Sequence, residues 1–425
     1  MKRFIIVTVL LALVILLIAL GGRDAPPPDV SDLSLPPLTD GGEANACSFF
    51  REAANRLYCP VDTGVLHDMM AGTTNAPKLV ATLVASNQQA FAQLDRGLNC
   101  QICILPAPDT DSDMPAEQCR NWIKMGCILW LQAQRELELG QLEAASVTCG
   151  RLIRFGGLVQ QEPQTLLQFL IGQTILGQGF WQIRILANHP EVTSRQLQRL
   201  AQQLDALAPP DKKLKRPFLV MFHLNASLLN QIKASPETFM DNTVNARGRL
   251  RVARFFFTPY FFKPNATMGH LANHYRKAMA NLSQPYATIK HQFQPVYPKT
   301  KLGRLVWWIR PNAVGRLFLL FDNDLIALGG IQSDSACSYY GTRLVLACRS
   351  YRLKHGEWPS ALAVLMPDHL ASIPSDPYDG ASFRYSRDKA IVYAVGKDLK
   401  DDGGEESNGS GLVGDDIVFP LVERK

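Results

Sequence analysis

An uncharged apolar run near the start of the chain is the feature that most constrains its architecture. No charged residue occurs from Phe4 to Leu20, and Lys2 and Arg3 precede the run. A helix of this length rises roughly 25 Å, close to the ~30 Å hydrocarbon core of a bilayer, and it lacks the polar face of a surface helix. The run is therefore a short membrane anchor or a signal peptide. We favour the anchor, because the apolar part of a signal peptide usually has only ~7–15 residues. The two cations favour a cytoplasmic N-terminus.

The length of the chain predicts more than one folded unit. At 425 residues it exceeds what one hydrophobic core usually organises, and 47% apolar residues can fill two or three cores. Clusters of proline and glycine between residues 24 and 44 indicate a linker, since such a segment has little that could pack. We expect four parts: an anchor or signal segment (1–22), a Pro/Gly-rich linker (23–44), a helical body (45–333) and a C-terminal domain (334–425).

Apolar residues in the body recur at helical spacing. Trp122, Ile123, Cys127, Trp130 and Leu131 include pairs three and four residues apart, and Gly140 interrupts the pattern before it resumes at Leu142. This predicts two antiparallel helices joined at Gly140. Further helices are expected at 163–187, 193–207 and 217–233, bounded by prolines. We expect an irregular helical bundle or solenoid, because no second copy of the hairpin follows at the 34-residue period of tetratricopeptide repeats.

Nine cysteines are compatible with an oxidising compartment. Cys100-x-x-Cys103 permits a redox or metal protein, but it has no second such pair at zinc-module spacing. Disulfides or plain buried thiols are therefore favoured. Cys337 and Cys348 fall in one predicted helix, where they are roughly 16 Å apart and too far for a disulfide.

The common catalytic motifs do not occur in the chain. Neither GxSxG, HExxH nor a Walker loop is present. The formal charge of +6 is spread without a long basic tract, so nucleic acid is not an expected partner. His270-x-x-x-His274 places two imidazoles on one helical face, but a third ligand is not evident. An extracytoplasmic hydrolase using these residues and His223 is the alternative to a non-enzymatic protein.

Residues 249–262 interleave arginines with six large aromatic rings. Such a segment suits a contact with a membrane surface or a protein partner. A core segment with outward-reaching arginines is the favoured interpretation.

The C-terminal region predicts a helix packed on a small antiparallel sheet. A helix is expected from Cys337 to Arg352, capped near Gly356. Two strands follow at 382–386 and 390–395, and a third begins at Ile417 after an Asp- and Gly-rich loop. The expected fold class is thus mainly α with a small α+β C-terminal domain.

This region resembles the globular domain of the major pseudopilins of type II secretion. The matching residues are Ser350 to Pro359 (SYRLKHGEWP), Leu362-x-x-Leu365, Pro374-x-Asp376-Pro377, Gly380, Tyr385, Val395-Gly396-x-Asp398, Gly403-Gly404 and Asp415-Asp416-Ile417. In that family the last loop binds calcium, so the resemblance implies that Asp398 and Asp416 are metal ligands, with Asp415 a neighbouring one. Calcium takes six to eight oxygen ligands, which an acidic, glycine-rich loop can supply. Leu399 replaces a family glycine and the loop is longer, so an acidic solvated loop is the alternative.

The chain is not itself expected to be a pseudopilin. Its N-terminus lacks the Gly-Phe-Thr-Leu-x-Glu processing site, and the helical body separates the membrane segment from the C-terminal domain. With residues 263–267 (KPNAT) and 401–404 (DDGG), the chain resembles a group of anchored bacterial proteins, many from planctomycetes. That resemblance implies architecture but no activity. We expect a non-enzymatic interaction or scaffold protein of the bacterial inner membrane, single-pass, with its body in the periplasm and an envelope protein as partner, linked to secretion or pilus machinery.

Overall fold

The computed structural model describes most of the chain between residues 22 and 422. The described ranges are 22–37, 45–105, 116–207, 214–234, 259–289, 300, 302–303, 306, 310–321, 324–405 and 416–422. The expected membrane segment lies outside these residues. Within the ranges that are described, no helix is both long and apolar enough to cross a membrane.

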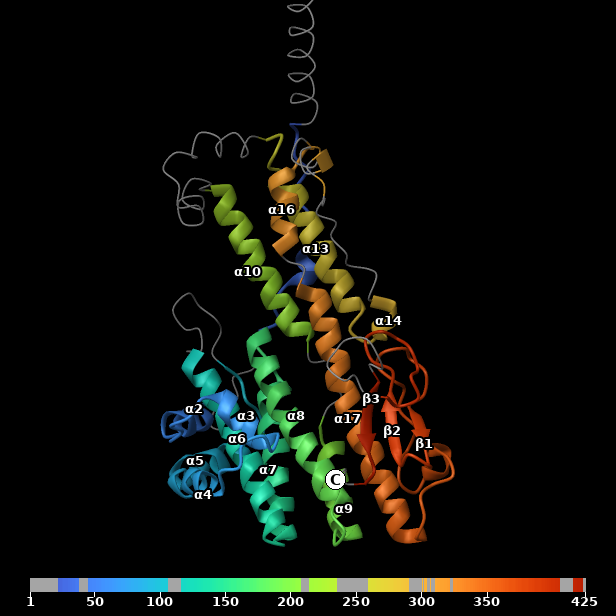
Figure 1. Cartoon of the computed structure of the whole chain (residues 1–425). Helices are drawn as coiled ribbons and strands as arrows, with labels where there is room; N and C mark the ends of the chain where they lie inside the picture. The colour runs from blue at the N-terminus through green and yellow to red at the C-terminus, as the bar shows by residue number, and fades with distance from the viewer. Residues whose placement is uncertain are drawn as a thin grey trace, which may run out of the picture. The chain divides into compact units, whose positions relative to one another are not determined.

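The chain divides into two compact units, each built from segments far apart in the sequence. The first unit takes its described residues from 1–36, 218–281 and 290–328, and the second takes them from 37–217, 282–289 and 329–425 (Figure 1). Most of the described elements are helices, and the remainder include a three-stranded antiparallel sheet. The predicted class, mainly α with a small C-terminal sheet, is confirmed.

Helices make up the N-terminal part of the second unit. They are α2 (Cys47–Asn55), α3 (Thr63–Met70), α4 (Pro77–Ser86), α5 (Gln88–Leu98), α6 (Ala116–Glu138), α7 (Leu142–Gln161), α8 (Leu166–Asn188) and α9 (Ser194–Asp205). The predicted hairpin around Gly140 is confirmed as α6 and α7. Gly140 has a φ of +71°, a left-handed conformation that glycine adopts readily and that ends a helix. At the start of α9, Thr193 and Gln196 form a capping box.

The C-terminal part of the second unit is a long helix, whose residues before Gly329 belong to the first unit, with a sheet beside it (Figure 1). The helix α17 (Asp324–His355) is followed by the short 3-10 helix η4 (Leu362–Leu365) and by β1 (Arg384–Ser386), β2 (Ile391–Ala394) and β3 (Ile417–Pro420). The strands lie in the order β1-β2-β3, with Tyr385 opposite Val392 and Ala394 opposite Ile417. The predicted helix and three strands are therefore present, although α17 begins earlier than expected and contains the expected domain boundary at 333/334.

Helix α17 contacts α8 and α9 as well as the sheet. Arg184 of α8 donates to the hydroxyl of Thr342 at 2.8 Å, and Arg343 forms an ion pair of 2.6 Å with Asp205 of α9. One hydrophobic cluster includes buried residues of α8, α9, α17 and the sheet. The sheet is consequently continuous with the helical core of this unit.

The first unit contains α10 (Lys215–Ala234, whose first residues belong to the second unit), α13 (Pro264–Ala280) and α16 (Ala313–Phe321). Residues 22–36, from the segment expected to be a linker, run beside α13, and we call them the strap. Leu33 of the strap is fully buried, and its carbonyl oxygen lies 2.9 Å from Nε2 of His223. Arg276 of α13 forms an ion pair of 2.6 Å with Asp32. Part of the expected linker is thus packed structure.

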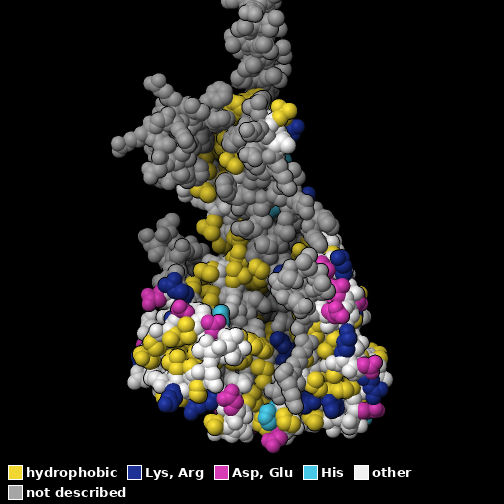
Figure 2. Space-filling view, viewed as in Figure 1, with side chains coloured by type: hydrophobic (Ala, Val, Ile, Leu, Met, Phe, Trp, Pro, Cys, Tyr) yellow, Lys and Arg dark blue, Asp and Glu magenta, His cyan; other side chains and the backbone are white. Residues whose placement is uncertain are grey.

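Side chains of both charge signs are interspersed over the visible face of the second unit (Figure 2).

All nine cysteines fall within described ranges and are free thiols, eight of them buried. Cys337 and Cys348 both lie on α17 and are not joined to each other, as predicted. The pair Cys100 and Cys103 is buried, and burial with the nearby Cys47 and Cys100 raises the pKa of Cys103 well above its ordinary value. Buried thiols of this kind are unreactive.

Gly341 of α17 marks the closest contact between this helix and the sheet. A Cβ atom there would lie 2.4 Å from the ring of Phe419, whereas a Cβ at Gly177 of α8 would meet nothing within 4 Å. We expect Gly341→Ala to lower the free energy of unfolding by about 1–2 kcal/mol, because overpacking outweighs the better helix propensity of alanine. The control Gly177→Ala should raise it by up to ~1 kcal/mol. Denaturant unfolding of the full chain measures both, and equal effects would contradict the close contact.

Candidate cation site in the C-terminal loop

The antiparallel pairing of β2 with β3 brings the two ends of the acidic loop together. The loop leaves β2 through Val395 and returns at Asp416, directly before Ile417, and Ala394 pairs with Ile417. Asp398 near the start of the loop and Asp416 at its end are therefore held at the same edge of the sheet. The sheet supplies a rigid base for whatever the loop binds.

Asp416 is the most enclosed carboxylate among the described residues of the loop. The residue is 4% exposed, and its Oδ2 atom accepts hydrogen bonds from the backbone amides of Gly404 at 2.7 Å and Asp402 at 3.1 Å. Its Oδ1 atom is also buried and has no hydrogen-bond partner among the described residues. Burial raises the pKa of the carboxyl group, and the neighbouring Asp401 adds to this. A buried oxygen without a donor is costly unless a proton, a water molecule or a cation satisfies it.

Positive φ angles at Gly403 and Gly404 turn the backbone toward Asp416. The two values are +70° and +80°, in the left-handed region that glycine adopts without strain. A Cβ at Gly404 would lie 2.3 Å from Ile391, so a larger residue does not fit there. The Gly-Gly pair recognised in the sequence thus shapes the loop around the Asp416 carboxylate.

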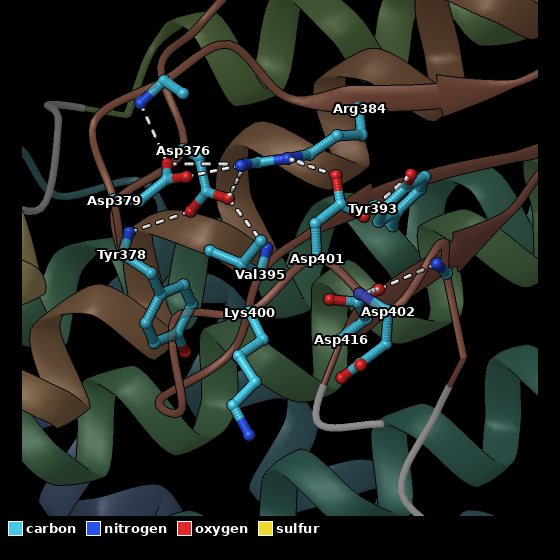
Figure 3. Close-up of polar contacts among 12 residues, drawn as sticks. Asp376, Tyr378, Asp379, Arg384, Tyr393, Val395, Lys400, Asp401, Asp402 and Asp416 are labelled. Atoms are coloured by element: carbon cyan, nitrogen blue, oxygen red, sulfur yellow. Dashed lines mark hydrogen bonds and ion pairs between the residues drawn. The ribbon is translucent and has the colours of Figure 1, made fainter. Parts of the chain in front are cut away.

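Asp401 fastens the same loop to the sheet (Figure 3). Its Oδ1 atom accepts from the amide of Gly403 at 3.0 Å and from the hydroxyl of Tyr393 at 3.2 Å. Its Oδ2 atom lies 3.5 Å from Nε of Arg384 in β1. Burial and the Asp401 charge raise the pKa of Tyr393. Asp401 is therefore engaged by protein donors on both oxygens.

Arg384 connects this loop to a second pair of carboxylates (Figure 3). It donates to Asp376 at 2.6 Å and also pairs with Asp379. Asp376 is nearly fully buried and accepts from the amides of Tyr378 and Val395, each at 2.8 Å. Burial raises the pKa of Asp376. This network joins the segment before β1, strand β1 itself and the loop after β2.

The predicted ligands have different surroundings. Asp398 accepts a hydrogen bond from the amide of Lys400 at 3.1 Å and lies 4.0 Å from the ammonium of the same residue. Asp416 bonds to Asp402 and Gly404, so the two predicted ligands share no hydrogen-bond partner. Asp415 lies outside the described residues. Among the residues that the structure describes, no group of three or more His, Cys, Asp or Glu side chains is placed to hold a metal ion.

Sequence reasoning did not identify Arg384 or the role of Asp401. The sequence pattern Pro374-x-Asp376-Pro377 contains Asp376 but assigns it no role, and residues 401–404 contain Asp401 but likewise assign it none. The sequence does contain one indication of this network, because the acids Asp376 and Asp379 are followed by the cation Arg384. A turn between them and the start of a strand at Arg384 would allow the opposite charges to pair. That signal is weak without the strand register.

The other candidate residues take part in the packing of the first unit. His223 contacts the carbonyl of Leu33, while His270 is exposed on α13 and His274 lies four residues further on. Tyr260, Phe261 and Phe262 are buried, which confirms the core interpretation for that end of the aromatic segment. The rest of the aromatic segment, 249–258, lies outside the described residues.

Comparisons of the chain with models of protein families, with curated proteins and with solved structures found no match. The pseudopilin resemblance and the calcium ligands that it implies therefore stay predictions from the quoted residues.

Replacement of Arg384 tests whether the carboxylate network holds the sheet and loop together. Arg384→Met would leave the buried Asp376 without its cation, and we expect a loss of about 3 kcal/mol in the free energy of unfolding. The control Arg387→Met removes an ion pair to Glu357 whose side chains are 47% and 67% exposed, so its cost should stay below about 1 kcal/mol. Chemical denaturation compares the two. Similar losses would show that Arg384 is no more important than a surface cation.

Proposed function

We propose that this chain is a membrane-anchored, non-enzymatic scaffold of the bacterial envelope whose C-terminal domain binds calcium in the loop from Asp398 to Asp416. The observation that carries the calcium part is the buried Oδ1 atom of Asp416, which has no donor among the described residues. Its partner oxygen is held by two amides, so the carboxylate has a defined orientation.

A calcium ion satisfies that oxygen better than water does, because it also neutralises the charge. A buried carboxylate without a cation carries a penalty of several kcal/mol, and calcium prefers carboxylate and carbonyl oxygens over nitrogen or sulfur ligands. Asp398, at the same edge of the sheet, is 29% exposed at its side chain and bonds only within its own turn, so it can rotate toward an ion. Asp415 is proposed as a third ligand on its sequence position alone.

Coordination by the loop explains why the domain carries so many acidic residues near Asp416. Asp401 and Asp402 both raise the pKa of Asp416 through their charges. Such like-charge repulsion destabilises the ion-free loop and is relieved by a divalent cation. Calcium would therefore act here as a structural element that orders the loop and the edge of the sheet.

The anchor and the scaffold role are supported by the apolar run from Phe4 to Leu20 and by the strap that follows it. In the proposed orientation the chain crosses the inner membrane once and exposes both units to the periplasm. The partner is proposed to be another envelope protein, of secretion or pilus machinery. No observation favours the hydrolase alternative, and His223 already has a packing role at the carbonyl of Leu33.

Thermal unfolding of the full chain in detergent, in calcium and in chelator, tests the ion site. Calcium at ~100 times its dissociation constant should stabilise the second unit by about 2.7 kcal/mol, which raises Tm by several degrees. Asp416→Asn and Asp398→Asn should abolish the shift. The control Asp368→Asn, at an exposed carboxylate paired with Lys354, should keep it. A wild-type Tm that is the same in calcium and chelator would overturn the calcium proposal.

Cross-linking in native membranes followed by purification of the tagged full chain tests the scaffold role. We expect one or a few envelope proteins to be captured repeatedly, and calcium depletion to reduce the capture because the C-terminal loop loses its order. The Asp416→Asn chain should show the same reduction while calcium is present. Repeated experiments that recover no common envelope protein would overturn the scaffold proposal.

A further inference from the structure

We infer that Arg23, Lys263 and Arg310 form a headgroup-binding cluster, by which the first unit rests on anionic phospholipids of the membrane. We call these three residues the cation cluster. The inference extends the proposed anchor and rests on it. It adds a lipid class and a defined surface to what the apolar run alone implies.

Lys263 is hydrogen-bonded to the backbone of Arg23 and to Asn312, which lies close to Arg310 in the sequence. Lys263 donates from its ammonium to the backbone carbonyl of Arg23 at 2.8 Å. Its own backbone amide donates to the side chain of Asn312 at 2.9 Å, and Asn312 follows Arg310 by two residues. The segments that contain Arg23 and Asn312 thus both contact Lys263 at the start of α13, although they lie roughly 240 and 50 residues from it in the sequence.

Within the described residues the three cations of this surface are not paired with acids, although Asp24 adjoins Arg23. None of the three cations forms an ion pair within the described part of the chain. Arg23 and Arg310 are exposed, and Lys263 is half-buried. Asp24 is the adjacent acid, and its carboxylate accepts from the amides of Asn265 and Ala266 at 2.8 and 3.1 Å, where it caps α13. A fourth cation, Arg316, has its pKa lowered by burial and by the neighbouring charge of Arg310.

Chain length fixes the distance of this surface from the bilayer. Arg23 follows the end of the apolar run at Leu20 by three residues, which span at most roughly 10 Å. The polar interfacial layer of a bilayer is about 5–7 Å thick on each side, and the Debye length at physiological salt is ~8 Å. Cations at Arg23 and Lys263 are therefore within electrostatic reach of the lipid phosphates whenever the apolar run spans the membrane.

The strap prevents the first unit from moving away. Asp24 caps α13, Asp32 pairs with Arg276 further along the same helix, and Leu33 is buried beside His223. A flexible linker would let a soluble unit explore many distances from its anchor. Here the first residues after the anchor are part of the fold, so the cation cluster stays at the membrane face.

Hydrogen exchange of the full chain in nanodiscs tests the inference. We compare discs of phosphatidylcholine alone with discs that also contain phosphatidylglycerol. Amides of residues 22–26, 259–266 and 310–316 should exchange severalfold more slowly in the anionic discs, and high salt should remove the difference by screening. The double variant Arg23→Glu/Arg310→Glu should exchange equally in both disc types.

The matched control is Lys277→Glu, an exposed cation in the last turn of α13 about 21 Å along the helix from Lys263. It should keep the difference between the discs. A chain that enters both discs but exchanges identically in them overturns the headgroup site and leaves the anchor in place. A chain that enters neither disc overturns the proposed anchor and this inference together.

Discussion

The burial of α17 between two different partners is the constraint on which the second unit depends. One side of the helix contacts α8 and α9 through Arg184, Arg343 and a shared apolar cluster, and another side meets the sheet at Gly341. A three-stranded sheet of such short strands has too little surface to be stable alone. The sheet is stable because α17 and the helices behind it provide the apolar surface that it covers.

The acidic loop follows from that arrangement. Once β2 and β3 are paired against α17, Asp416 is placed at a buried position, and the amides of Asp402 and Gly404 can satisfy only one of its oxygens. The carboxylate of Asp376 is buried as well, and its negative charge is compensated by Arg384, which also pairs with Asp379. The two carboxylates differ because Asp376 has a protein cation and Asp416 has none among the described residues. The proposal of an external ion at Asp416 rests on that difference.

The first unit uses charge in another way. Its strap is held by the cap that Asp24 provides to α13, by the ion pair of Asp32 with Arg276 and by the buried Leu33. Arg23, Lys263 and Arg310 form no ion pair within the described residues. In the proposed arrangement the membrane supplies the anions that the chain lacks.

Local features of the sequence determined the αα-hairpin at Gly140, the helical character of 337–352 and the three C-terminal strands. The spacing of apolar residues, the β-branched residues in strands and the glycines that end helices all act over a few residues, so they can be read from the sequence. The pseudopilin resemblance, and not a local pattern, singled out Asp398, Asp415 and Asp416, which stay predicted ligands. Only the tertiary structure decided that α17 joins the sheet to α8 and α9, that the strap packs through Leu33, and that Arg384 serves Asp376. Each of these depends on pairs of residues far apart in the chain, such as Arg276 with Asp32, whose contact no local pattern encodes. The burial that leaves one oxygen of Asp416 without a donor is likewise a property of the assembled sheet and not of the loop sequence.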